Sequence, residues 1–199
     1  MHKVRIAVLM VVSMFLLATN RFPPGEYQAP LPKTGQVTSY ATSDDGDLIK
    51  GIAWPNPRFT DNGDGTVTDN LTGLIWLKDT NCFGMCSISE GLNDCYRLSE
   101  GQCGLTDGSS AGDWRLPNSN ELASLVHKGY YNPAVSNTTG TGQWSEGDLF
   151  NNVQSYSYWS SPTDASTTVS AWGVNVYSGR MYDFSKTSYG YIWPVRGGH

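Results

Sequence analysis

The sequence predicts an α+β domain with two short helices and a mostly antiparallel sheet in two parts. Strand-like segments come first, two helix-like segments follow, and strand-like segments return in the last third of the chain. Aromatic residues make up 12% of the 199 residues and charged residues only 16%, which favours a packed core over a disordered chain. The 22 glycines, which occur among Asp, Asn, Ser and Thr, indicate many turns and few long helices.

Residues 1–18 are typical of a secretory signal peptide. Lys3 and Arg5 precede an apolar run at residues 6–18 that only Ser13 interrupts. Because this run is shorter than the roughly 20 residues that cross a bilayer as a helix, we expect cleavage rather than the alternative, an uncleaved anchor. The protein is therefore expected to be exported to the periplasm, the cell surface or the medium, with no membrane span after cleavage.

Residues 19–39 are predicted to form an extended linker, because they hold four prolines and show little periodicity. The folded domain is then expected at residues 40–198. Loss of the signal peptide removes two basic residues and leaves 11 basic against 18 acidic side chains. Nucleic-acid binding depends on clustered Lys and Arg, so this acidic balance argues against a nucleic-acid partner.

The first strands are predicted on either side of turns that are rich in Asp, Asn and Gly. Phe59 precedes a turn at residues 61–65, and a β-branched strand is expected at residues 66–68. A second turn follows at residues 69–73, and an apolar strand is expected at residues 74–77. Asp-Gly between strand-like segments is a strong hairpin signal, because both central residues of a type I′ turn need positive φ. These residues therefore predict a β-meander.

The first helix is predicted to begin after Ser87. Glu90 lies three residues further on, and together these two residues match the capping-box pattern. Gly101 is a plausible end for the helix. Apolar side chains recur between them at helical spacing, at Ile88, Leu92, Cys95 and Tyr96.

The second helix is predicted to begin at Asn118, with Glu121 at the third position, and to end at Gly129. Its apolar face would be formed by Leu122, Leu125 and Val126. His127 would lie in the last turn, where a protonated imidazole interacts well with the helix dipole. Apart from the terminal His199, it is the one histidine of the mature chain, so the sequence predicts neither histidine-based catalysis nor a multi-histidine metal site.

The last third of the chain is predicted to be β again. Strands are expected at residues 156–160, 170–177, 180–184 and 191–196. The second of these alternates, and a two-residue turn at Ser178 and Gly179 joins it to the third. Five tryptophans in apolar or alternating contexts are expected in the core: Trp76, Trp114, Trp159, Trp172 and Trp193.

The four cysteines, Cys82, Cys86, Cys95 and Cys103, lie close together in the sequence. An even number in an exported chain favours two disulfides. A zinc site is the alternative, but its usual ligand spacing is two C-x2-C pairs, and the first gap here is C-x3-C. We therefore expect disulfides, and three pairings remain open on these grounds.

The acidic turns suggest calcium as the one metal to consider. Asn62 and Asp64 match the third and fifth positions of an EF-hand loop, and Asp69 lies nearby. Thr60 and Leu71 occupy the end positions, where such a loop needs Asp and Glu. Hairpin turns explain the same residues, so we expect no cofactor and keep these three as weak calcium candidates.

Aromatic residues in polar, loop-rich surroundings are the best candidates for ligand binding. A flat apolar face beside hydrogen-bonding groups is what sugar or protein recognition uses, although packing under loops is the alternative for each residue singly. The set comprises Trp144, Tyr156, Tyr158, Tyr182, Tyr189 and Tyr191.

Three long motifs resemble the Lcl C-terminal domain family of bacterial exported proteins. The first runs through residues 58–76, the second is Gly112-Asp113-Trp114-Arg115-Leu116-Pro117-Asn118, and the third is Trp193-Pro194-Val195-Arg196. The resemblance implies a C-type-lectin-like fold over residues 40–198. It also implies a disulfide between Cys82 and Cys103, which leaves Cys86 and Cys95 as an extra, nested pair.

The chain departs from related proteins in ways that limit the function. The Glu-Pro-Asn, Gln-Pro-Asp and Trp-Asn-Asp motifs of calcium-dependent lectins do not occur. No cysteine follows Cys103, so the chemistry of the related formylglycine-generating enzymes is not supported. We therefore expect a non-catalytic adhesion or binding module for a glycan or a protein at the cell surface. The alternatives are a structural component of an envelope assembly and an envelope hydrolase.

Overall fold

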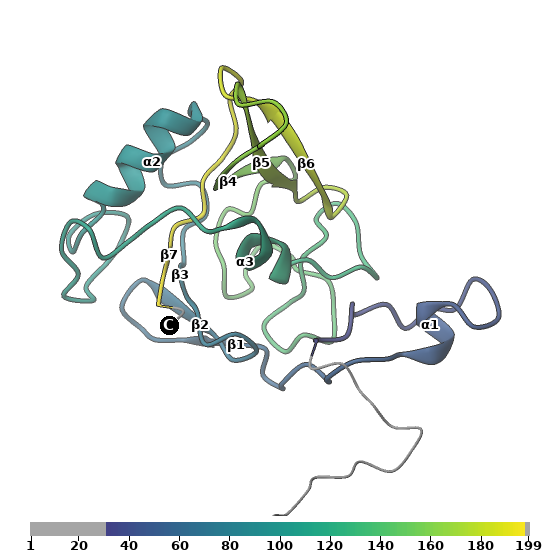
Figure 1. Cartoon of the computed structure of the whole chain (residues 1–199). Coiled ribbons are helices and arrows are strands. Elements are labelled where there is room, and N and C mark those ends of the chain that lie inside the picture. The colour runs from purple at the N-terminus through teal and green to yellow at the C-terminus, as the bar shows by residue number, and fades with distance from the viewer. Residues whose placement is uncertain (1–30, 198–199) are drawn as a thin grey trace, which may run out of the picture.

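The computed structural model describes residues 31–197, and the predicted signal peptide lies outside them. Two antiparallel sheets and three short helices make up this part of the chain, which confirms the predicted α+β class (Figure 1). In chain order the elements are α1 (Asp45–Leu48), β1 (Phe59–Asp61), β2 (Thr66–Asp69), β3 (Ile75–Leu77), α2 (Ile88–Arg97), α3 (Ser119–Ser124), β4 (Ser157–Thr163), β5 (Ser170–Asn175), β6 (Arg180–Ser185) and β7 (Val195–Arg196).

One sheet has the strand order β1-β2-β3-β7 and the other β4-β5-β6. The predicted Asp-Gly hairpin joins β1 to β2, with Gly63 and Gly65 at positive φ as a tight turn requires. In the first sheet Trp76 pairs with Val67 on one side and with Val195 on the other. Strand β7 is therefore an edge strand of this sheet and lies next to β3. The predicted final strand is shorter than expected, because within residues 191–194 only Tyr191 forms a bridge, to Tyr158.

Helix α2 forms as predicted, with both hydrogen bonds of the Ser87–Glu90 capping box. Its buried face includes Ile88 and Cys95, as predicted, and also Gly91. The helix face at Gly91, which carries no side chain there, is the one that packs closely against Ile192. Leu92 and Tyr96 therefore point away from this contact and are exposed. The helix packs against β4.

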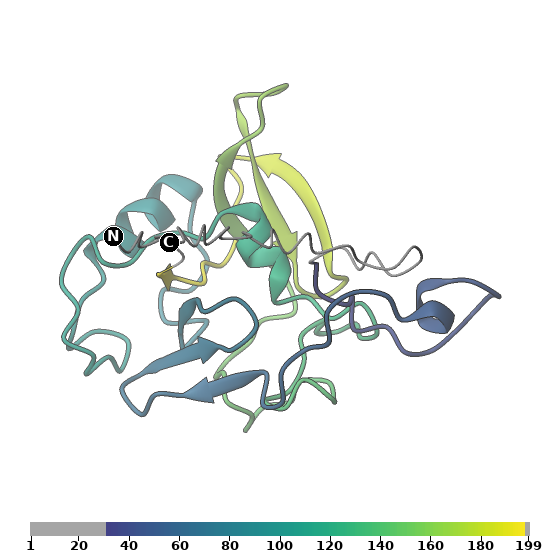
Figure 2. The same ribbon diagram turned by 60° about the horizontal axis from the view of Figure 1, so that its bottom comes forward.

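Helix α3 is shorter than predicted and ends at Ser124 rather than near Gly129. The chain leaves the helix because Val126 forms a backbone bridge with Val135 and the His127 N–H donates to the Ala134 carbonyl at 2.9 Å. His127 therefore lies beyond the helix, and its predicted interaction with the helix dipole is wrong. The helix packs against β4 and β5, as Figure 2 shows.

The largest cluster of buried side chains draws residues from both sheets, and four of the five predicted core tryptophans are buried in this structure. Trp172 is the exception and is only half-buried. Its neighbours Ala171 and Gly173 lie against the stacked rings of Trp159 and Phe184, so alternation along β5 directs Trp172 to the other face.

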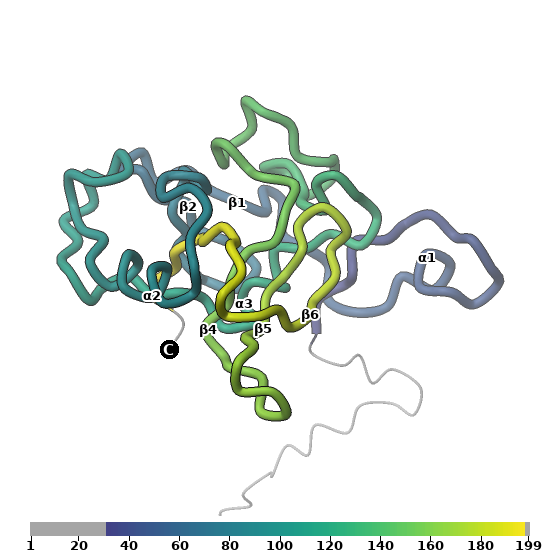
Figure 3. The backbone as a smooth tube through the Cα atoms, turned by 90° about the horizontal axis from the view of Figure 1, so that it is seen from above, coloured from purple at the N-terminus to yellow at the C-terminus, as the bar shows by residue number. Residues whose placement is uncertain are grey.

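The part of the predicted linker that the structure describes is attached to the domain. Pro32 forms a parallel bridge with Ile52, and the Lys128 N–H donates to the Thr34 carbonyl at 2.8 Å. The chain then projects to one side as an excursion that carries α1, and returns to the domain before β1 (Figures 1 and 3). Residues 31–39 are thus not a free spacer in this structure.

Candidate binding sites

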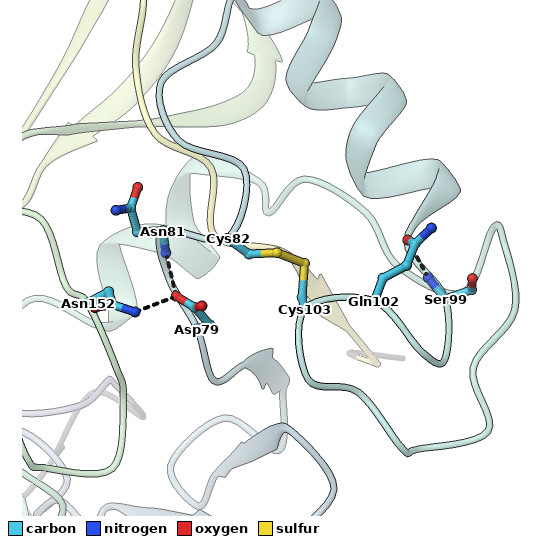
Figure 4. The surroundings of a disulfide bond; sticks show 7 residues. All are labelled: Asp79, Asn81, Cys82, Ser99, Gln102, Cys103 and Asn152. Carbon is cyan, nitrogen blue, oxygen red and sulfur yellow. Dashed lines mark hydrogen bonds between the residues drawn. A yellow bond between two sulfur atoms is a disulfide. The ribbon is translucent and has the colours of Figure 1, made fainter.

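The disulfide between Cys82 and Cys103 is present, and Figure 4 shows its surroundings. The second predicted bond is not formed: Cys86 and Cys95 are free, buried thiols in one apolar cluster. Burial raises the pKa of the Cys86 thiol to about 11 and that of Cys95 further above its usual value. Both thiols therefore stay protonated at neutral pH, which disfavours thiol–disulfide exchange because the thiolate is the reacting form.

The three weak calcium candidates do not form a site together. Asp69 is fully buried and paired with Arg58, whose Nε and Nη2 donate to its two carboxylate oxygens at 2.8 and 2.9 Å. Asn62 and Asp64 accept hydrogen bonds from Thr68 and Thr66 within the hairpin turn. Within residues 31–197, no group of three or more His, Cys, Asp or Glu side chains is placed to hold a metal ion.

Tyr158 and Trp144, two of the six aromatic candidates, lie in the core and at its edge. Tyr158 is fully buried, and its hydroxyl accepts a hydrogen bond from the Gln154 N–H at 2.8 Å. Burial also raises the pKa of Tyr158 to about 12. Trp144 packs against the core and donates to the Phe150 carbonyl at 3.0 Å. Tyr158 is therefore excluded as a ligand-binding residue, because it is inaccessible.

The other four tyrosines divide into two groups, and we call Tyr156, Tyr191 and the exposed Tyr189 the tyrosine surface. Tyr156 and Tyr191 meet edge to face with ring centroids 6.2 Å apart, and the Tyr182 hydroxyl is hydrogen-bonded to Ser157. The Tyr191 N–H donates to the Ser157 carbonyl at 2.9 Å, and the Tyr191 ring lies beside Tyr156 and Tyr158. Tyr182 pairs with Gly173 opposite Trp159, so its ring lies on the other face of this sheet, next to Phe184. Tyr189 lies in the segment between β6 and β7, as Tyr191 does. The Tyr189 side chain is 60% exposed and that of Tyr156 is 49% exposed.

A polar cleft of about 380 Å³ lies between the β1–β2 hairpin and the loop before β4. It is lined by the Lys78–Asp61 ion pair and by Asp148 and Asn151, among others. The hydrogen bond from Lys78 and that from the Gly63 N–H hold the pKa of Asp61 below its usual value. An adjoining cavity of about 250 Å³ shares Lys78 and Asn151 and reaches Asp79 beside the disulfide (Figure 4).

A third cavity, of about 260 Å³, is lined in part by aromatic rings, and we call it the aromatic pocket. His127 stacks on Tyr130 with centroids 4.1 Å apart and meets Trp54 edge to face at 4.9 Å. Burial, followed by the charge of Arg58, lowers the pKa of His127 to about 4. The imidazole is thus neutral at pH 7, the opposite of the cation that its sequence position suggested.

The sequence did not predict the aromatic pocket, because four distant segments build it. Lys33 comes from the predicted linker, Trp54 from the segment before β1, and Tyr130 and Thr141 from the loops after α3. The one feature of the sequence that could have indicated this pocket is Trp54, a tryptophan in a segment without regular structure. Its partners depend on how the excursion returns to the domain.

Within the described residues, no helix has the length and apolar character needed to cross a membrane. No match was found among curated proteins. A family model described as the Lcl C-terminal domain matches residues 65–196, which is most of the chain and includes both sheets from β2 onwards. The motifs around Trp76, Trp114 and Trp193 led to the same family. The chain therefore belongs to the Lcl C-terminal domain family.

Proposed function

We propose that this protein is an exported, non-catalytic binding module that recognises a glycan or a protein surface. The observation that carries the proposal is the tyrosine surface. Tyr156 is 49% exposed and Tyr189 60%, and Tyr191, which packs against the core, holds the Tyr156 ring in an edge-to-face contact. Rings held in this way present flat apolar faces with little loss of side-chain entropy on binding, a property of protein recognition surfaces.

Export is supported by two features. The disulfide between Cys82 and Cys103 is compatible with an oxidising compartment, and residues 1–18 have the pattern of a signal peptide. The C-type-lectin-like fold that the family resemblance implied is retained as part of the proposal, since two antiparallel sheets with short helices are compatible with it.

The histidine and the two free cysteines within residues 31–197 are poorly suited to act as a general base or as nucleophiles. The Nδ1 atom of His127 accepts a hydrogen bond from the Gly129 N–H at 3.1 Å, and its pKa of about 4 makes it a weak base at neutral pH. Burial keeps the thiols of Cys86 and Cys95 protonated.

The test is binding to a glycan array by the wild-type protein and by Tyr156→Ala and Tyr189→Ala variants. Loss of one stacked ring is expected to weaken binding about fivefold, because such a contact contributes about 1 kcal/mol. Tyr96→Ala on α2 is the matched control, since Tyr96 is 63% exposed but lies outside the tyrosine surface. Thermal melting verifies that all variants fold.

Unchanged glycan binding in the Tyr156 and Tyr189 variants would contradict the assignment of this surface. An array without binding, combined with retention of a protein partner that the same substitutions abolish, would assign the surface to protein recognition in an envelope assembly. Turnover of an envelope glycan that is lost on changing one carboxylate would favour the hydrolase alternative.

A further inference from the structure

The lining of the aromatic pocket suits an apolar group. Trp54, Tyr130, Val37 and Ala53 form much of its wall, and its volume of about 260 Å³ lies just below the roughly 300 Å³ at which pockets for drug-sized ligands begin. A cavity of this size accommodates one ring-bearing side chain rather than a run of sugar units.

Most polar atoms of this lining already have partners. Trp54 Nε1 donates to the Lys33 carbonyl at 2.8 Å, and the Tyr130 hydroxyl donates to the Thr141 carbonyl at 3.1 Å. His127 Nδ1 is occupied by the Gly129 N–H. Few groups are left for the hydroxyls of a sugar, which need several hydrogen bonds when they are desolvated. The polar cleft, with its carboxylates and Asn151, is the contrasting case.

The charge at the pocket favours an acidic ligand although the protein as a whole is acidic. Lys33 is the one charged side chain among the lining residues, and it forms no ion pair within residues 31–197. The Arg58 guanidinium, paired with Asp69, lies 4.2 Å from the ring centroid of Trp54. A cationic ligand would therefore be placed beside positive groups, whereas a carboxylate could pair with Lys33.

Exposed apolar side chains occur in the two chain segments, residues 31–37 and 52–54, that contribute to the pocket lining. Val37 is 71% exposed, Leu31 66% and Ile52 46%. Figures 1 and 3 show that the excursion that carries α1 projects from the domain, where a partner can reach it. An anchoring pocket with apolar surface around it is the arrangement that protein interfaces use at their centre.

We propose that the aromatic pocket is a docking site for a protein partner, which inserts one large apolar side chain and places a neighbouring carboxylate against Lys33. None of the tyrosine surface lines this pocket, so the inference goes beyond the proposed function and can fail independently of it.

The test is a titration followed by the backbone amide signals of the protein in NMR spectra. The probes are phenylacetate, phenethylamine and a methyl glucoside. Phenylacetate is expected to bind in the millimolar range and to shift residues 33–37, 53–54, 127–130 and 140–141. Phenethylamine should bind about two- to fivefold more weakly, the difference that one partly exposed charge pair gives.

Two variants and a control make the titration specific. Lys33→Gln should remove the preference for phenylacetate over phenethylamine, and Ala53→Leu should abolish binding of both by narrowing the pocket. Lys186→Gln is the matched control, because Lys186 does not line the pocket, and this variant should behave as the wild type. Tyr156→Ala should also leave the titration unchanged, which separates this result from a failure of the proposed function.

The outcomes decide between ligand classes. Absence of shifts at the pocket, or equal affinity for both ring probes, overturns the proposal. Shifts caused by the glucoside at lower concentration than by phenylacetate reassign the pocket to a sugar. A displayed peptide library selected on the wild type and counter-selected on Ala53→Leu should enrich a large apolar residue next to Asp or Glu, and failure to enrich one overturns the protein partner.

Discussion

His127 is 5% exposed and lies among aromatic rings, with the buried Arg58 nearby. At this residue the surroundings reverse what the sequence position suggested. Desolvation penalises the charged imidazole, and the nearby guanidinium penalises it further. The same environment that removes the charge also fixes the ring as a wall of the aromatic pocket.

The lowered pKa of His127 predicts a loss of stability on acidification. The folded pKa of about 4 lies below the ordinary 6.5, so between these values the unfolded chain binds a proton that the folded chain does not. The contribution is fully present above pH 6.5 and is lost as the pH falls to about 4. Its full extent is about 3 kcal/mol, because one pKa unit corresponds to about 1.4 kcal/mol.

Urea unfolding of the wild type and of His127→Phe at pH 7.5 and pH 4.5 measures this effect. The wild type should lose about 2–3 kcal/mol more than the variant between the two conditions. Asp61 and Glu121 also have lowered pKa values, caused chiefly by Lys78 and Arg115, but they act equally in both proteins. Parallel pH profiles would show that His127 is protonated in the folded state.

At the scale of elements, α2 and α3 show which features of a helix depend on neighbouring residues in the sequence alone. Both capping boxes form as the sequence predicts, because Ser87 with Glu90 and Asn118 with Glu121 satisfy backbone N–H groups within one turn. The end of α3 and the buried face of α2 depend on other segments. Gly91 is the clearest example, since it is the residue at which α2 approaches Ile192.

Substitution Gly91→Ala is expected to destabilise the protein although alanine favours a helix by about 1 kcal/mol over glycine. The added Cβ would lie 2.6 Å from Ile192 Cγ2, and relieving such overpacking costs about 1–3 kcal/mol. Denaturant unfolding measures the net loss. In a double-mutant cycle with Ile192→Ala, the effect of Gly91→Ala should shrink, because the contacting methyl group is absent.

Asn93→Ala is the control for helix propensity, since Asn93 is exposed on the same helix. It should raise stability slightly. A stabilising Gly91→Ala, equal to this control, would mean that α2 shifts away from Ile192 without loss.

At the scale of the whole molecule, the Cys82–Cys103 bond closes a segment that contains α2. Its sequence separation of 21 residues predicts that removing the bond, as Cys82→Ser with Cys103→Ser, costs about 3 kcal/mol, through the greater freedom of the unfolded chain. Equilibrium unfolding of the double variant measures this loss. An unchanged stability would indicate compensating strain in the bonded form.

Thiol titration of the denatured, unreduced protein should detect two thiols, from Cys86 and Cys95, and four after reduction. A count of none before reduction would restore the second disulfide that the family resemblance predicted. A count of four before reduction would contradict the oxidised state of the chain and with it the support for export.

The sequence by itself determined the family, the α+β class, the hairpin turns, both helix starts and one disulfide. These depend on patterns within a few residues, such as positive φ at Gly63 and Gly65 or a cap three residues before its partner. Tertiary structure alone decided that Tyr158 is buried, that Asp69 pairs with Arg58, and that Trp54 and His127 form a pocket. The reason is that burial, pKa and pocket shape arise from contacts between distant segments, and spacing along one segment does not encode them.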